Sequence, residues 1–203
     1  MNSANEFGMQ YATEQLRRSR STARKAIKFF YLENILRDVK GKSIDFGCGA
    51  GQLLARLPEG SVGLEIDPHL VETLRQSGLN AVRHDAGDDF SLRNLAPGHF
   101  QTFVMAHVLE HFDEAHKVLR KILTSCRRLG IERAIIVVPG PKGYRSDKTH
   151  KTLVNRHYLS THGLLDCEGY AVRQAHYFPI NIESVGDYFT FHEFKFIYDR
   201  KPF

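Results

Sequence analysis

The chain has 203 residues, of which 42% are hydrophobic and 25% charged, and its formal net charge is +5. These values are typical of one compact globular domain and exclude disordered and fibrous classes. No apolar run approaches the roughly 20 residues needed to cross a bilayer, and the first ten residues lack the apolar segment of a secretory signal. The three cysteines are widely separated, which favours reduced thiols in a cytoplasmic protein over a disulfide framework.

Basic residues gather in the N-terminal part of the chain, at Arg17, Arg18, Arg20, Arg24, Lys25 and Lys28. A basic helix can bind nucleic acid, anionic lipid or an anionic substrate. Runs of this kind more often form a solvated helix face. The charge by itself therefore does not select a partner.

The chain up to residue 138 alternates between helical and strand-like hydrophobic patterns. Helical periodicity predicts helices over residues 21–39 and 52–57, from Pro68 onward, and over 113–128. Short apolar runs predict strands over residues 43–46, 61–66, 81–84, 102–106 and 133–138. This alternation indicates a parallel sheet with helices on both faces.

The pattern changes after Pro141, where a polar loop precedes a predicted helix over residues 155–168 and strands over 171–177 and 194–199. The last two strands have no long helix between them, which indicates an antiparallel hairpin at the sheet edge. We expect residues 1–203 to form a single domain in which residues 1–40 are an N-terminal helical extension.

The first predicted strand leads into a glycine turn, Gly47-Cys48-Gly49-Ala50-Gly51. These glycines let the backbone approach an adenosine-type ligand closely. A dinucleotide fingerprint would need glycine at position 52, which is Gln52. Asp45, just before the turn, disfavours a pyrophosphate and suits a cationic ligand. The pattern favours S-adenosylmethionine, which carries a sulfonium and an ammonium group and has no phosphate.

Two further acids follow in the expected order. Glu65 ends the second predicted strand, about 20 residues beyond the turn, where an acidic side chain can bind both ribose hydroxyls. Asp85 follows the third strand and can reach the adenine amino group, with Ala86 leaving room for the ring. A single acid at a strand end is more often a helix cap or a loop residue. The ordered set therefore indicates the cofactor site.

Several segments resemble motifs of a known enzyme class. The turn from Asp45 to Gly51 resembles motif I of the class I S-adenosylmethionine-dependent methyltransferases, and Gly63-Leu64-Glu65-Ile66-Asp67 resembles their second motif. Val108-Leu109-Glu110-His111-Phe112 and Asp147-Lys148-Thr149-His150 resemble segments of the methyltransferase type 11 and type 23 domain families. The resemblance extends from about Lys40 to Ala175 and does not specify a substrate.

This resemblance implies an α/β fold with a Rossmann-like seven-stranded sheet in the order 3-2-1-4-5-7-6, strand 7 antiparallel, and helices on both faces. It implies methyl transfer from S-adenosylmethionine, with S-adenosylhomocysteine as product. We expect cofactor contacts from Asp45, Gly47, Cys48, Gly49, Gly51, Glu65, Ile66, Asp85, Ala86 and Ala106.

Transfer to a hydroxyl or ammonium group also requires loss of a proton, and histidine titrates in a suitable range for a general base. Candidates near the carboxyl ends of the strands are His111, His150 and His107. The equivalent of His111 occurs in the resembling families whatever the substrate. A structural role for it is therefore equally consistent with the sequence.

Two metal patterns overlap these histidines. His107-Val108-Leu109-Glu110-His111 matches the H-x-x-E-H pattern of inverzincins, but it follows a strand, which argues against zinc hydrolysis. It also resembles the divalent-metal motif E-x-x-E-H of ubiquinone-pathway O-methyltransferases and small-RNA 2′-O-methyltransferases, with His107 replacing the first glutamate. That replacement, with His150 able to complete a set, moves the site from Mg²⁺ towards a softer metal or none. We expect no metal.

Little chain remains for an acceptor-binding domain, so we expect a small metabolite or saccharide-type acceptor, methylated at oxygen. The segment with Phe178, Tyr188, Phe189 and Phe191 could line an acceptor pocket, although packing on the late hairpin is the slightly favoured interpretation. An RNA acceptor bound by the basic helix is the alternative, and a non-catalytic protein that keeps the fold is a third possibility.

Overall fold

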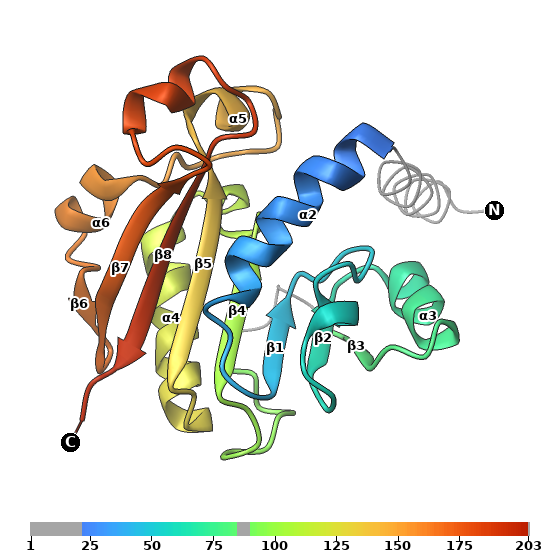
Figure 1. The fold of residues 1–203 in the computed structure, drawn as a ribbon. Helices are drawn as coiled ribbons and strands as arrows, with labels where there is room; N and C mark the ends of the chain where they lie inside the picture. The colour runs from blue at the N-terminus through green and yellow to red at the C-terminus, as the bar shows by residue number, and fades with distance from the viewer. Residues whose placement is uncertain (1–21, 85–89, 203) are drawn as a thin grey trace.

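The computed structural model describes residues 22–84 and 90–202, with side chains from residue 29 onward (Figure 1). The helices are α2 (Thr22–Leu36), α3 (Pro68–Gln76), α4 (Ala115–Leu129), α5 (Pro141–Arg145) and α6 (Arg156–Thr161). The strands are β1 (Ser43–Phe46), β2 (Val62–Glu65), β3 (Ala81–Arg83), β4 (Thr102–Ala106), β5 (Arg133–Pro139), β6 (Asp166–Cys167), β7 (Tyr170–Phe178) and β8 (Glu193–Arg200). Short 3₁₀ turns are η1 (Leu54–Arg56), η2 (Leu109–His111) and η3 (Glu183–Asp187).

One sheet carries the order β3-β2-β1-β4-β5-β8-β7-β6. Strands β1 to β5 pair in parallel, and β8 pairs antiparallel with both β5 and β7. The expected order 3-2-1-4-5-7-6 matches the first seven positions of this sheet when β8 is counted as strand 7 and β7 as strand 6. The Rossmann-like α/β arrangement is therefore confirmed. The expected hairpin forms, and β8 lies inside the sheet between β5 and β7.

The structure has eight strands where we expected seven. The helix predicted over residues 155–168 ends at Thr161, and the residues after it include the additional strand, β6. Gly163 follows in the left-handed region with φ of +60°. The chain then forms β6 and returns into β7 through Glu168 and Gly169, whose φ angles are +54° and +82°. Two left-handed residues make a tight hairpin turn, which adds an eighth strand at the edge.

The other predicted elements differ from the observed ones mainly in length. The helix predicted over residues 52–57 is only the 3₁₀ turn η1, which ends before Leu57, the residue that precedes Pro58 and is extended. Helix α3 begins as expected, because Pro68 stands in its first turn and Asp67 accepts hydrogen bonds from the amides of His69 and Leu70. Helix α5 and turn η3 lie in segments for which we predicted no helix.

Helices cover both faces of the sheet (Figure 1). On one face Ile35 of α2 packs against Val104 and Ile135, and on the other α4 packs Leu119 and Ile122 into the main core. Alternate residues of β4 and β5 therefore serve opposite faces. Among the helices of residues 22–84 and 90–202, none is long and apolar enough to cross a membrane.

The carboxyl ends of the parallel strands meet at one edge, where α5, η3 and the segments around them lie (Figure 1). In open α/β sheets ligands bind outside this edge. The N-terminal basic residues Arg17, Arg18 and Arg20 lie outside the described residues, so the structure adds nothing to their predicted role.

Candidate active site

A pocket of about 730 Å³ opens at the carboxyl ends of β1, β2, β4 and β5. Its walls come from the glycine turn, the ends of β2 and β4, helix α2 and the segment that leads into β8. Eight of the ten expected cofactor residues lie in the described chain, and of these all but Gly51 line the pocket: Asp45, Gly47, Cys48, Gly49, Glu65, Ile66 and Ala106.

The three turn glycines are all left-handed, with φ angles of +72°, +53° and +70° at Gly47, Gly49 and Gly51. A Cβ atom at Gly47 would lie 2.4 Å from Val108, and one at Gly51 would lie 2.4 Å from Leu74. At Gly49 no atom of the described chain lies within 4 Å of the Cβ position. Packing therefore accounts for Gly47 and Gly51, and Gly49 leaves open space for a ligand.

Glu65 is buried at the end of β2 and reaches back to the glycine turn. Its carboxylate accepts hydrogen bonds from the amides of Gly49 at 2.8 Å, Ile66 at 2.9 Å and Asp67 at 3.1 Å. Gly63, the first residue of the second motif, permits this approach, since a Cβ atom there would lie 2.7 Å from the Cys48 sulfur. Glu65 thus ties the two expected cofactor motifs together.

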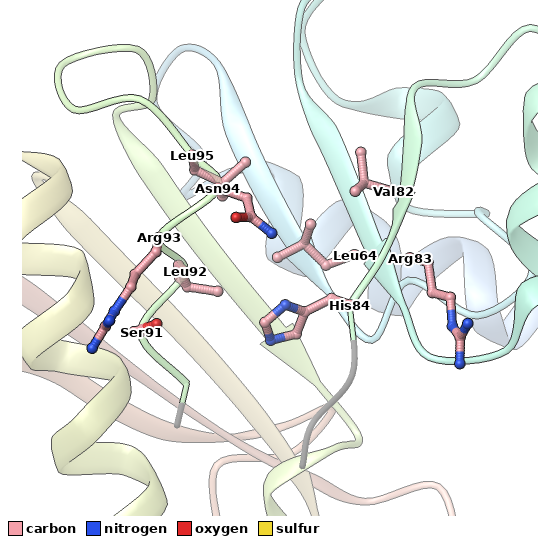
Figure 2. Close-up of a pocket in the computed structure, with 9 residues that line it drawn as sticks. All are labelled: Leu64, Val82, Arg83, His84, Ser91, Leu92, Arg93, Asn94 and Leu95. Carbon is pink, nitrogen blue, oxygen red and sulfur yellow. The ribbon is translucent and has the colours of Figure 1, made fainter. Parts of the chain in front are cut away.

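Asp85 and Ala86, the expected adenine contacts, lie outside the described residues. A separate hollow of about 360 Å³ is lined by Leu64, Val82–His84 and Ser91–Leu95, which Figure 2 shows as sticks. Arg83 and Arg93 point away from its centre in the same view. This hollow shares no lining residue with the large pocket.

His107 follows β4, lines the large pocket and has a left-handed backbone, with φ of +57°. Its Nε2 lies 2.7 Å from a Glu193 oxygen, and its Nδ1 lies 3.5 Å from a Glu110 oxygen. Burial alone would lower the pKa of His107, but the two carboxylates outweigh it and raise the pKa to about 10. A protonated imidazole cannot accept a proton, so the geometry favours His111 and His150 as candidates for a base.

Glu110, His111 and His150 converge although 39 residues separate the last two in the sequence (150 − 111). One ligand atom from each lies within 4.8 Å of the others, an arrangement that could hold a metal ion. The amides of Lys151 and Thr152 donate to the Glu110 carbonyl oxygen at 2.8 and 3.1 Å, which holds the His150 loop against η2. The sequence suggested this grouping only through the resemblance.

The segment before β8 supplies residues that our sequence reading missed. Thr190, His192 and Glu193 line the pocket, and so does Phe191, one of the four aromatic residues noted in the sequence. Phe178 packs edge-on against Tyr31 of α2 at 5.1 Å between ring centroids, whereas Tyr188 is 80% exposed. The interpretation that all four pack on the late hairpin is therefore wrong for Tyr188 and Phe191.

A buried acid before a glycine turn and a second acid at the next strand end line one pocket at the switch point of the sheet. This is the arrangement that the resemblance to class I S-adenosylmethionine-dependent methyltransferases implies. Residues 44–131 match the family model described as a methyltransferase domain. These residues hold the glycine turn, Glu65 and the Glu110-His111 pair. The match identifies a methyltransferase domain in this part of the chain.

Solved structures share the fold at low identity. An S-adenosylmethionine-dependent methyltransferase from Archaeoglobus fulgidus is 16% identical, with a TM-score of 0.63 over 98% of this chain and 100% of that one. Magnesium protoporphyrin IX methyltransferase from Synechocystis, with bound S-adenosylhomocysteine, is 13% identical, with a TM-score of 0.61 over 93% and 94%. The methyltransferase domain of a bacterial Hen1 protein is 18% identical, with a TM-score of 0.63 over 87% and 100%. A search of curated proteins gives no match.

Proposed function

We propose that this enzyme methylates a hydroxyl oxygen of a small-molecule acceptor, a metabolite or a saccharide-type compound. The observation that carries the proposal is one pocket of about 730 Å³, whose walls include the glycine turn and Glu65 as well as His107 and His111. This volume lies within the roughly 300–1,000 Å³ of small-molecule sites. The cofactor and a small acceptor can therefore meet in one cavity.

At the cofactor end, we propose that Gly49 leaves space for the adenosine part and that Glu65 binds the ribose hydroxyls. The Glu65 carboxylate lies in the pocket wall and faces the turn, which supports this role. Asp45 is 3% exposed and also lines the pocket, where its charge suits the cationic groups of the cofactor. The adenine contacts of Asp85 and Ala86 remain predictions.

The transfer itself breaks the bond between methyl carbon and sulfur and forms a carbon–oxygen bond. The sulfur keeps the electron pair and becomes the neutral thioether of S-adenosylhomocysteine, and the hydroxyl proton is lost. Alignment of oxygen, carbon and sulfur can supply about 7–11 kcal/mol at the ideal limit. We propose that His111 and His150 activate the hydroxyl. His111 lines the pocket, and the ring of His150 lies beside the ring of His111, with 4.9 Å between their centroids.

The test is transfer of a labelled methyl group from S-adenosylmethionine to a panel of hydroxylated small molecules, with RNA oligonucleotides as a second panel. We expect label in small molecules and stable methyl ethers as products. His111→Ala should bind S-adenosylhomocysteine as the wild type does and lose transfer by about 100-fold or more. Label in RNA alone would show that the acceptor is RNA and not a small molecule. Cofactor binding without transfer to either panel would favour a non-catalytic binding protein.

A further inference from the structure

We propose that the exposed hydrophobic surface beside the pocket binds an anionic phospholipid surface. Phe29 and Phe30 of α2 and the hydrophobic side chains of residues 180–191, here called the η3 segment, enter the boundary between lipid headgroups and acyl chains. The basic residues of α2 face the headgroups. The proposal goes beyond the proposed function, because it concerns where the protein works and holds for any acceptor.

The exposed large hydrophobic side chains gather on few segments of the chain. Nine such side chains are exposed among the described residues, and only Leu165 belongs to a segment that has no residue in the pocket wall. The other eight lie on α2, at Ile66 and in the η3 segment. Tyr31 of α2 packs on Phe178, two residues before the η3 segment, so the two largest groups are neighbours. A gathering of this kind marks an interaction site, whereas single exposed hydrophobic residues are common.

The η3 segment holds its hydrophobic side chains at the surface on a fixed backbone. Tyr188 is 80% exposed and Ile182 57%. Lys142 of α5 donates to the Tyr188 carbonyl oxygen at 2.6 Å, which fastens the backbone to α5. A Cβ atom on Gly186 would lie 2.7 Å from Pro141, so the two backbones are in close contact. These side chains therefore project from the edge of the sheet where α5 lies (Figure 1).

The η3 segment itself contributes hydrophobic contact rather than charge. It holds two acidic residues, Glu183 and Asp187. Asp187 pairs with Arg145 of α5 at 3.5 Å, and Lys142 is bound to the same turn. The attraction to anionic lipid must therefore come from α2.

Helix α2 carries the charge that an anionic surface requires. Residues 22–32 include no acidic residue and three basic ones, Arg24, Lys25 and Lys28. Lys25 precedes Phe29 by four residues, which places the two on the same side of the helix. Helices that combine basic residues with exposed aromatic residues bind in the plane of anionic membranes. Each Lys or Arg close to such a surface raises binding by roughly fivefold.

The surroundings of Phe29 and Phe30 suit lipid better than nucleic acid. Nucleic acids bind aromatic residues by stacking bases on the ring face. The guanidinium group of Arg56 lies over the Phe29 ring, 5.0 Å from its centroid, and the two phenylalanine rings meet edge to face at 5.9 Å. Ile180 and Ile182 are exposed and offer neither a ring nor a polar group. A lipid interface accepts aliphatic and aromatic side chains alike.

Vesicle binding tests the proposal without cofactor or acceptor. Full-length protein is sedimented with vesicles of phosphatidylcholine alone and of phosphatidylcholine mixed equally with phosphatidylglycerol. We expect binding to the phosphatidylglycerol vesicles to be at least about tenfold stronger at low salt. Most of that difference should disappear at about 1 M salt, where the Debye length is about 3 Å.

Two pairs of substitutions locate the hydrophobic contact. Phe29→Ser combined with Phe30→Ser should weaken binding to phosphatidylglycerol vesicles by about tenfold or more, because two large side chains leave the lipid interface. Ile182→Ser combined with Tyr188→Ser should do the same. Leu165→Ser is the matched control, since Leu165 is 47% exposed but lies outside the proposed surface, and it should bind as the wild type does. Thermal unfolding shows that each variant is folded.

Lys25→Gln combined with Lys28→Gln tests the charge and should weaken binding to phosphatidylglycerol vesicles by about 25-fold. Absence of vesicle binding at low salt would overturn the proposal, as would equal binding to both kinds of vesicle or unchanged binding in both hydrophobic pairs. RNA binding that the phenylalanine pair abolishes, without vesicle binding, would instead assign the surface to nucleic acid. A dimer in light scattering that either hydrophobic pair dissociates, again without vesicle binding, would assign it to a second copy of the chain. None of these outcomes bears on the proposed function, because no methyl acceptor is present.

Discussion

Gly49 differs from the other glycines of its turn, because the space where a side chain would lie is open. The positions of Gly47 and Gly51 are filled by Val108 and Leu74, whereas the space beside Gly49 is open and belongs to the pocket. The turn therefore combines two glycines needed for packing with one positioned at the ligand.

Replacing Gly49 with alanine should separate ligand contact from backbone strain. The variant forces a side chain into a left-handed position, which costs about 1–2 kcal/mol, and places a methyl group where the cofactor is expected. We expect S-adenosylhomocysteine to bind at least about tenfold more weakly, or about 1.4 kcal/mol, by calorimetry. Gly78→Ala is the control, because Gly78 has φ of +78° and an open Cβ position away from the pocket. Equal cofactor affinity in the two variants would contradict the assignment.

At the scale of elements, helix α2 is fastened to the sheet by a buried cation. Lys195 of β8 is 1% exposed and donates to the Asn34 side chain at 2.8 Å and to Asp38 at 2.7 Å. Helix α2 also lines the pocket with Tyr31 and Leu32. This contact therefore connects the position of the helix with the shape of the cofactor site.

Lys195→Met should loosen α2 while conserving most of the buried volume. The variant removes the ammonium group that donates hydrogen bonds to the Asn34 and Asp38 oxygens. We expect this loss to lower the free energy of unfolding by about 1–3 kcal/mol. Urea unfolding measures this cost, and we expect weaker S-adenosylhomocysteine binding as well. Lys201→Met removes an exposed ion pair with Asp166 and should cost about 0–1 kcal/mol. If both variants lost the same stability, the proposed role of Lys195 would be wrong.

A second contact between elements joins β5 to β8 and depends on pH. Arg133 and Asp199 face each other in the strand register and form two hydrogen bonds, of 2.7 and 3.0 Å. The hydrogen bond from Arg133 lowers the pKa of Asp199 below its ordinary value. A carboxyl group with a lowered folded pKa contributes stability above its unfolded pKa, and this contribution is lost as the pH falls through the folded pKa.

Asp199→Asn should therefore destabilise the protein by about 1–3 kcal/mol at pH 7, measured by urea unfolding. The difference from the wild type should shrink as the pH falls below about 4, because Asp199 is then protonated in the unfolded chain and, at still lower pH, in the folded protein. Asp166→Asn, at an exposed ion pair, is the control and should change little at either pH. A difference that stayed constant down to pH 3 would show that the charge of Asp199 is not responsible.

At the scale of the whole molecule, cofactor binding should stabilise the fold, because the pocket joins segments from β1, β2, β4 and the chain before β8. S-adenosylhomocysteine at 100 times its dissociation constant should add about 2.7 kcal/mol. For a chain of this size that corresponds to a rise in Tm of roughly 5–10 °C. Thermal unfolding with NAD⁺ in place of S-adenosylhomocysteine should show no shift. A shift with NAD⁺ alone would contradict the cofactor assignment.

The sequence by itself determined the parallel core of the sheet and the glycine turn at its edge. Strands β1 and β4 lie where their apolar runs predicted, and the cofactor motifs are continuous in the chain, so local periodicity and spacing were sufficient to find them. The eighth strand depended on left-handed residues at Glu168 and Gly169, one of which is not glycine. Single-residue turn geometry of this kind has a weak sequence signal.

Only the tertiary structure decided which distant residues meet in the pocket. It brought Glu193 to His107 and His150 to Glu110, and it left Phe191 in the pocket wall rather than on the hairpin. The physical reason is that these contacts depend on where the loops after β5 and before β8 pack. That packing minimises the free energy of the whole chain, and no local pattern of residues encodes it.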